Sequence, residues 1–142
     1  MDEGVLGVHR TRNGVSEAVF LNKTLFKYGN MRDLTRAQKA DQDGGWGTKS
    51  NRKGFASVVQ HELAHATWNN HLTAPNAIRA TTSIQKLYAT WKADKSRKKL
   101  GYGSYAKSNV NEFFAETAMK AVSGRQDKYT KAIKTIIKKY KL

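Results

Sequence analysis

Apolar residues recur along the second half of the chain at the spacing of amphipathic helices. Downstream of Pro75, four large side chains follow the order i, i+3, i+4, i+7: Ile84, Leu87, Tyr88 and Trp91. This spacing places them on one face of a helix. Pro75 marks the start of that helix, because proline suits the first turn, and the glycines of Gly101–Gly103 interrupt the pattern beyond it.

Three further segments have helical patterns. One covers residues 55–69 and ends near Asn69-Asn70, with apolar residues on or near one face: Phe55, Val58, Val59, Leu63 and Ala66. Another runs from a cap at Asn109 to Val122, with Gly124 past its end. The last begins at Asp127 and has an apolar face, namely Tyr129, Ile133, Ile136, Ile137 and Tyr140. Its outer face is basic: Lys128, Lys131, Lys134, Lys138 and Lys141.

The N-terminal third combines a strand with turn signals. Val15–Asn22 has the composition of a strand, and Met31–Asp41 has helix formers with a helical apolar spacing. The glycine-rich cluster Asp43–Gly47 is a turn that can lead into a short strand, and Ser50–Gly54 is a polar connection. Together with the helices, these patterns predict one α+β domain over residues 1–142, mostly helical, with a short mixed sheet in its N-terminal third.

Composition agrees with one globular domain and excludes several chemistries. The 142 residues are 39 % apolar, no run approaches the roughly 18 apolar residues of a membrane span, and no signal peptide is visible. Because the chain has no cysteine, disulfides, thiolate zinc sites and cysteine nucleophiles are excluded. Any metal must therefore be held by histidine and carboxylate.

The charge is strongly positive. The chain carries 26 Lys and Arg against 11 Asp and Glu, a net charge of +15. Such an excess can bind nucleic acid, another polyanion or an acidic substrate, and a solvated basic surface is the equally good alternative. Because acids are scarce, the positions of the five glutamates are informative: Glu3, Glu17, Glu62, Glu112 and Glu116.

The segment His61-Glu62-Leu63-Ala64-His65 matches the pattern H-E-x-x-H. On a helix, His61 and His65 lie on one face about 5–6 Å apart, so both imidazoles can bind one zinc ion. Glu62 is offset from them and can reach a water on that metal. Zinc lowers the pKa of such a water to about 7, and a glutamate can take its proton as the water attacks a carbonyl.

His71 is a tempting third ligand, because it stands where the longer H-E-x-x-H-x-x-G-x-x-H motif has its last histidine. That motif needs a glycine where the helix breaks, and this chain has Trp68 there. A bulky residue takes the required positive φ only with strain. If the helix continues, His71 lies about 240° around the axis from His65 and about 9 Å further along. We therefore do not expect His71 to bind the metal.

Glu112 and Glu116 are the better candidates. They lie one turn apart on a predicted helix, where two carboxylates repel by a few tenths of a kcal/mol, so a nearby cation would explain the pair. Alternatively, Asn109 and Glu112 form a capping box. Capping accounts for Glu112 and leaves Glu116 without a partner, whereas a metal and a histidine would account for both.

With HELAH and the downstream SYAKSNVNEFFAE, the chain resembles the gluzincin peptidases of the anthrax lethal-factor-like catalytic domain group and small phage-encoded metallopeptidase domains. The likeness covers about Phe55 to Val122 and is strong at these two motifs. It implies a zincin-like domain with HELAH on the active-site helix, a bound Zn²⁺ and endopeptidase activity.

The resemblance also implies a role for each of six residues: zinc ligands His61, His65 and Glu112, general base Glu62, a carboxylate that orients a ligand histidine, Glu116, and an oxyanion-stabilising hydroxyl, Tyr105. A phenol beside zinc can donate a hydrogen bond where negative charge develops, and Tyr102 is the alternative. An extended substrate would add to an edge strand, either Val15–Asn22 or the segment around Trp46.

We therefore expect a zinc-dependent endopeptidase that acts on peptides or proteins, located in the cytoplasm or in a virion. Two other functions fit parts of the sequence. A nucleic-acid-associated protein would explain the charge of +15, and the basic cluster Lys95, Arg97, Lys98 and Lys99 is a candidate contact. A structural virion component that keeps the fold would agree with the phage resemblance.

Overall fold

In the described residues the fold is mostly helical, with a small antiparallel sheet. A computed structural model describes residues 7–13, 15–21, 35–36, 39–40, 42–50, 55–71 and 75–142. Its elements, in chain order, are β1 (Gly7–Arg12), β2 (Val15–Leu21), α2 (Phe55–His71), α3 (Ala77–Ala93), the short 3₁₀ helix η2 (Tyr105–Lys107), α4 (Val110–Val122) and α5 (Lys128–Tyr140). This confirms the predicted α+β class.

The sheet is a hairpin of β1 and β2. Gly7 pairs with Leu21 and Arg12 with Val15, with a register shift between Arg10 and Thr11. β2 confirms the predicted strand, except that Asn22 lies outside the described residues. β1 was not predicted, although Asn13-Gly14 is a typical hairpin turn and Asn13 has φ +52°. The expected mixed sheet is wrong for the described residues, since such a tight turn joins only antiparallel strands.

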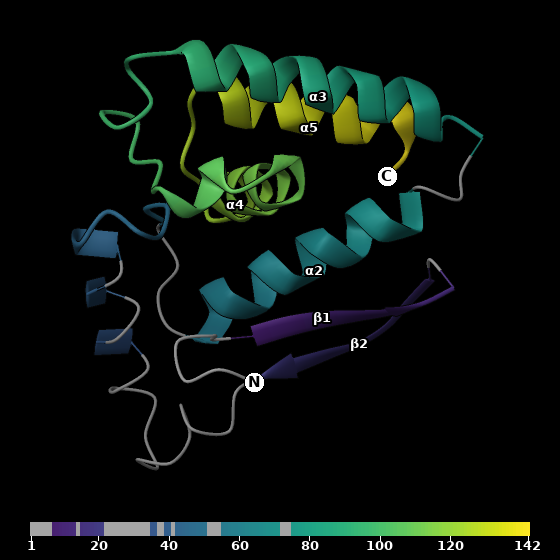
Figure 1. Ribbon diagram of the computed structural model, residues 1–142, viewed down its shortest axis with the longest axis horizontal. Helices are drawn as coiled ribbons and strands as arrows, with labels where there is room; N and C mark the ends of the chain where they lie inside the picture. The colour runs from purple at the N-terminus through teal and green to yellow at the C-terminus, as the bar shows by residue number, and fades with distance from the viewer. Residues whose placement is uncertain are drawn as a thin grey trace.

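The helices form layers, with α4 in the centre (Figure 1). α3 and α5 lie side by side on one side of α4, and α2 lies on the other, against the hairpin. Every residue of α4 from Phe113 to Ala121 is buried, as expected of a helix with neighbours all around it. The site residues on α4 are therefore held in the most enclosed element of the fold.

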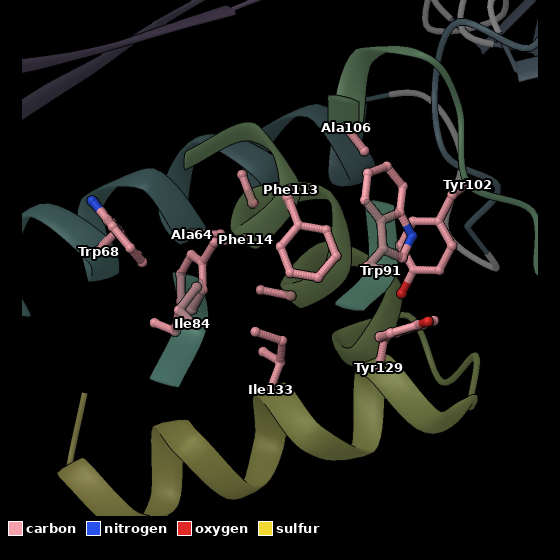
Figure 2. Packing of buried hydrophobic residues seen from close by; sticks show 12 residues of the cluster. Ala64, Trp68, Ile84, Trp91, Tyr102, Ala106, Phe113, Phe114, Tyr129 and Ile133 are labelled. Atoms are coloured by element: carbon pink, nitrogen blue, oxygen red, sulfur yellow. The ribbon is translucent and has the colours of Figure 1, made fainter. Parts of the chain in front are cut away.

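Aromatic residues fill the core between α3, α4 and α5 (Figure 2). Phe113 of α4 lies 5.0 Å from Trp91 of α3, ring centre to ring centre, and Tyr102 lies 5.4 Å from Trp91. On the α2 side, Trp68 packs 5.3 Å from Phe114. Such ring pairs add about 0.5–1.5 kcal/mol each beyond the area that they bury. Together with the contact of Tyr129 of α5 with Phe113, 6.5 Å between ring centres, they join three helices to α4 and so keep its position constant.

Most of the predicted helices are confirmed, with small differences at their ends. Asn109 caps α4, and Asp127 caps α5 with a capping box. α2 continues to His71 rather than ending near Asn69. Of the predicted helix 31–41, only residues 35–36 and 39–40 are described, and they are helical; the rest lies outside the described residues. In the part of the chain that the structure describes, no helix is long and apolar enough to cross a membrane.

Candidate metal centre

Three side-chain atoms from two helices converge on one point. Nε2 of His61 lies 3.0 Å from Nε2 of His65. Oε2 of Glu112 lies 3.2 Å from each of these two nitrogens. Within the described residues, these three form the histidine and carboxylate group that could hold a metal ion. The structure thus brings together the three residues that the sequence analysis suggested as ligands.

Two helix geometries produce this arrangement. His61 and His65 stand one turn apart on α2, with ring centres 4.7 Å apart. Glu112 is the third residue of α4, where its backbone N–H donates to Oδ1 of Asn109 at 2.9 Å. The Glu112 carboxylate faces the two imidazoles and does not complete a capping box. Capping therefore explains the backbone of Glu112, and the histidines explain its side chain.

The donor set fits a tetrahedral zinc ion. With zinc–ligand bonds of about 2.0–2.1 Å, tetrahedral geometry separates neighbouring ligand atoms by about 3.3 Å, close to the observed 3.0 and 3.2 Å. Oε2 of Glu112 is buried and has no hydrogen-bond partner of good geometry in the described residues. Two imidazole nitrogens at 3.0 Å can share one proton in a hydrogen bond, or both can bind one cation that lies between them. One bound metal ion would satisfy all three atoms.

Glu116 fixes the orientation of His61. Its Oε1 lies 2.8 Å from Nδ1 of His61, and its Oε2 accepts a hydrogen bond of 2.8 Å from the backbone N–H of Thr48. A carboxylate at Nδ1 keeps the proton there, so Nε2 is free to bind a metal. Glu112 and Glu116 thus face the same imidazole from its two nitrogens.

The carboxylates make the centre favourable for positive charge. Burial opposes an imidazolium, but the contacts of His61 with the carboxylates of Glu112 and Glu116 outweigh burial and raise the pKa of His61 to about 10. Burial likewise opposes the charge on Glu112, yet the contacts with His61 and His65 lower its pKa to about 2. A proton or a metal ion can supply the positive charge that these two carboxylates attract.

Tyr105 lies against the centre, and Tyr102 does not. The ring of Tyr105 stacks on His61, with centres 5.9 Å apart. Burial and the carboxylates of Glu112, Glu116 and Glu62 raise the pKa of Tyr105, so its phenol keeps its proton and can donate a hydrogen bond. Tyr102 instead packs in the aromatic core against Trp91 (Figure 2), which removes it as the alternative.

Glu62 lies beside the centre without joining the group of three ligand atoms. Its side chain is 5 % exposed, and its charge contributes to the raised pKa of Tyr105. Glu62 and Tyr105 therefore act electrostatically on the same space next to His61. The H-E-x-x-H spacing predicts that a residue in this position touches a water rather than the metal.

The loop around Trp46, predicted as a turn and as a candidate edge strand, also supports the centre through Thr48, a residue that the sequence did not single out. The segment Gly45–Lys49 runs beside Gly101–Tyr105, and its Thr48 donates to Glu116. Thr48 is buried, and its Oγ1 accepts a hydrogen bond from the backbone N–H of Gly103. No motif pointed to Thr48, because a backbone N–H carries no sequence signal and the partner lies 68 residues away.

A histidine ligand at position 71 would require the helix to break at position 68, and no break occurs at Trp68. Trp68 is helical and only 4 % exposed, and α2 continues unbroken to His71. The side chain of His71 is outside the described part of the structure. The backbone is nevertheless helical as far as His71. The sequence analysis made this condition its reason for not expecting His71 to bind the metal.

The two candidate edge strands also differ. The carbonyls of Gly45 and Trp46 already accept hydrogen bonds from Ser104 and Tyr105, at 2.8 and 2.9 Å. The Trp46 segment therefore cannot offer these groups to a peptide, whereas β2 is an edge of the hairpin within the described residues.

Comparison of the chain with protein-family models, with curated proteins and with solved structures found no match.

Proposed function

We propose that the protein is a zinc-dependent endopeptidase of the gluzincin type. The observation that carries the proposal is the triangle of His61 Nε2, His65 Nε2 and Glu112 Oε2, with sides of 3.0 to 3.2 Å. Three protein ligands that include two histidines and a glutamate are typical of catalytic zinc, which keeps a fourth position for water or substrate. The resemblance in sequence to gluzincins supports the same proposal independently of the distances.

Each residue of the centre has a definite task in peptide hydrolysis. His61, His65 and Glu112 would hold the zinc, which polarises the substrate carbonyl and makes water acidic enough to attack near neutral pH. Glu62 accepts the proton of the attacking water and passes it to the leaving amine. The phenol of Tyr105 donates a hydrogen bond to the oxygen on which negative charge develops. Glu116 keeps the Nδ1 proton of His61 in place.

The test compares the wild type with Glu62→Gln. We expect about one zinc per chain in both proteins by elemental analysis, and cleavage of a proteome-derived peptide library by the wild type alone. Glu62→Gln keeps the size of the side chain and removes the base, so it separates metal binding from catalysis. A wild type without zinc, or a Glu62→Gln variant that cleaves as fast as the wild type, would refute the proposal.

The charge distribution supports a second function, the binding of nucleic acid. Four exposed lysines lie along α5 and at its C-cap, and we call them the α5 stripe: Lys131, Lys134, Lys138 and Lys141. No ion pair involves them among the residues that the structure describes. The opposite side of α5 places Tyr129 and Ile133 in the core, so no apolar face of this helix remains for a bilayer. A row of lysines can bind the phosphates of a nucleic acid, and the affinity of such binding falls steeply as the salt concentration rises.

A further inference from the structure

Trp46 is the most exposed tryptophan of the chain, and it lies next to the candidate metal centre. Its side chain is 55 % exposed, whereas Trp68 and Trp91 are 4 % and 0 % exposed. A single exposed apolar side chain is common on protein surfaces and proves nothing by itself. What distinguishes Trp46 is how firmly its backbone is held and what its ring touches.

The backbone of Trp46 is held by the segment that carries Tyr105. The N–H of Tyr105 donates to the carbonyl of Trp46 at 2.9 Å, and the N–H of Ser104 donates to Gly45 at 2.8 Å. Further along, the N–H of Lys49 donates to Gly101 at 2.7 Å. These bonds connect the segment before α2 with the segment before α4. Trp46 therefore has a constant place beside Tyr105.

Three rings form a series from the surface to the metal centre. The indole of Trp46 lies 5.3 Å from the ring of Tyr105, tilted by 33°. Tyr105 in turn stacks on His61 at 5.9 Å. A substrate bond that is hydrolysed at the centre must lie beside Tyr105, so the residue next to that bond lies within reach of the indole. Rigid aromatic rings give large contact area at little cost in conformational entropy.

We propose that the indole of Trp46 is a substrate subsite for an aromatic or large aliphatic side chain on the residue beside the scissile bond. This rests on the proposed endopeptidase function. A lysine or arginine can also stack on an indole, but the net charge of +15 repels a basic substrate. An apolar side chain gains contact with the exposed indole without that repulsion.

Cleavage of matched peptides tests the subsite. A sequence that the wild type cleaves in a proteome-derived library is resynthesised with Phe, Leu, Ala or Lys beside the scissile bond. We expect kcat/KM for Phe and Leu to exceed that for Ala by about threefold to tenfold, the range of an aromatic contact. Trp46→Ala should reduce this ratio to about one, Trp46→Phe should keep most of it, and Ile78→Ala, an exposed apolar control on α3, should not change it.

Fluorescence gives a readout that does not depend on turnover. Because Trp46 is the exposed tryptophan, acrylamide quenches mainly its emission. In zinc-loaded Glu62→Gln protein, the Phe peptide should protect the emission from quenching and the Ala peptide should protect it less. Trp46→Phe should lose this protection.

Several results would overturn the subsite. Equal protection by the Phe and Ala peptides would do so, as would a preference for Lys. A Trp46→Ala variant that slows all four peptides by the same factor would show that Trp46 only supports Tyr105. A wild type that cleaves nothing would refute the peptidase itself and the subsite with it, whereas cleavage without a Trp46-dependent preference refutes the subsite alone.

Discussion

At the scale of single residues, two glutamates one turn apart have different tasks because their surroundings differ. Oε2 of Glu112 lies 3.2 Å from each of the two imidazole nitrogens and has no hydrogen-bond partner of good geometry in the described residues. Both oxygens of Glu116 have a partner, Nδ1 of His61 and the N–H of Thr48. Glu112 is therefore the carboxylate with an oxygen still to satisfy, and Glu116 is the one that orients its neighbour. Loss of the Glu112 carboxylate should therefore remove a zinc ligand, whereas loss of the Glu116 carboxylate should change which nitrogen of His61 carries the proton.

Glu116→Gln should weaken zinc binding by about 10- to 100-fold, as the loss of such an orienting carboxylate typically does. A glutamine can still accept the Thr48 hydrogen bond. Its amide nitrogen would then face Nδ1 of His61 and donate to it, which moves the ring proton to Nε2 and blocks the ligand atom. Competition with a chromophoric chelator measures the affinity. Glu17→Gln, in an exposed ion pair of the hairpin, is the control and should bind zinc as the wild type does.

Tyr105→Phe should lower kcat by about 10²- to 10³-fold, the usual loss when one donor to an oxyanion is removed. The phenylalanine ring keeps the stacking on His61, so KM and zinc content should change little. Tyr102→Phe removes a hydroxyl from the core, three residues away in sequence, and should retain its kcat. Steady-state kinetics on one cleaved peptide distinguish the two. Equal loss of kcat in both variants would contradict the assignment of Tyr105.

The sequence predicted the centre as far as local spacing carries information. His61, Glu62 and His65 follow from one helical motif, and Trp68 already argued against His71. Glu112 was suggested by its pairing with Glu116 in an acid-poor chain. Thr48 and the ring of Trp46 were beyond reach, because their contacts with Glu116 and Tyr105 exist only once distant segments pack.

At the scale of elements, a close contact between two loops holds the centre together. A Cβ on Gly103 would overlap the carbonyl oxygen of Trp46 and come within 2.6 Å of the carbonyl oxygen of Gly47. Only glycine allows the segment 45–49 to lie so near to 101–105. Since Thr48 belongs to that segment, the distance between the loops also sets the hydrogen bond to Glu116.

Gly103→Ala should therefore separate the loops and lower the free energy of unfolding by about 1–3 kcal/mol, the usual cost of overpacking. Zinc affinity should fall as well, because Thr48 would no longer hold Glu116. Gly47→Ala is the matched control, since its Cβ would meet only Cγ of Gln42 at 3.6 Å, an ordinary contact. Urea unfolding and chelator competition measure the two effects. Equal stability of the two variants would contradict this account.

Asp94 connects the end of α3 to the start of α5. It accepts hydrogen bonds from Tyr129 and Ser96, and it pairs with Lys128 at 2.7 Å. The lysine first, and then the hydroxyls and the Ser96 N–H, lower the pKa of Asp94. A lowered folded pKa means that the stabilisation is complete above the unfolded value, near 3.9, and is lost as the pH falls toward the folded value.

Asp94→Asn should accordingly lower the melting temperature at pH 7 and at pH 5 by the same amount. Below about pH 4 the gap to the wild type should shrink, because the wild type begins to lose the same charge. Asp43→Asn, in an exposed ion pair with Lys39, should have little effect at any of these pH values. Thermal unfolding followed by circular dichroism gives all the comparisons. A difference in melting temperature between the wild type and Asp94→Asn that grows as the pH falls would contradict the lowered pKa of Asp94.

The helices were predictable because each carries its own apolar stripe, and α4 and α5 also have side-chain caps, at Asn109 and Asp127. The hairpin was only half predicted, since β1 alternates weakly and Asn13-Gly14 was the one strong signal. The end of α2 was misplaced by two residues, because Asn69 and Asn70 are poor helix formers that nevertheless lie inside the helix. The low helix propensity of these two residues did not end the helix.

At the scale of the whole molecule, charge is divided between the inside and the surface. C-terminal to Pro75 the chain has four acids, Asp94, Glu112, Glu116 and Asp127. All four have internal partners: Glu112 and Glu116 meet histidines, Asp94 binds Lys128, and Asp127 binds the buried Lys120. The four lysines of the α5 stripe thus have no described carboxylate to offset them. The excess of +15 is concentrated on the surface.

The α5 stripe should consequently bind double-stranded DNA of arbitrary sequence through its phosphates. Its four lysines extend over about 15 Å, and each phosphate contact contributes about 0.9 to the slope of log K against log salt concentration. Replacing all four with glutamine should reduce that slope by up to about 3.6. The matched control replaces four exposed lysines outside both basic clusters, Lys49, Lys86, Lys92 and Lys107, which changes the net charge equally. Fluorescence anisotropy at several salt concentrations measures both slopes; equal losses would show that total charge, and not the stripe, attracts the DNA.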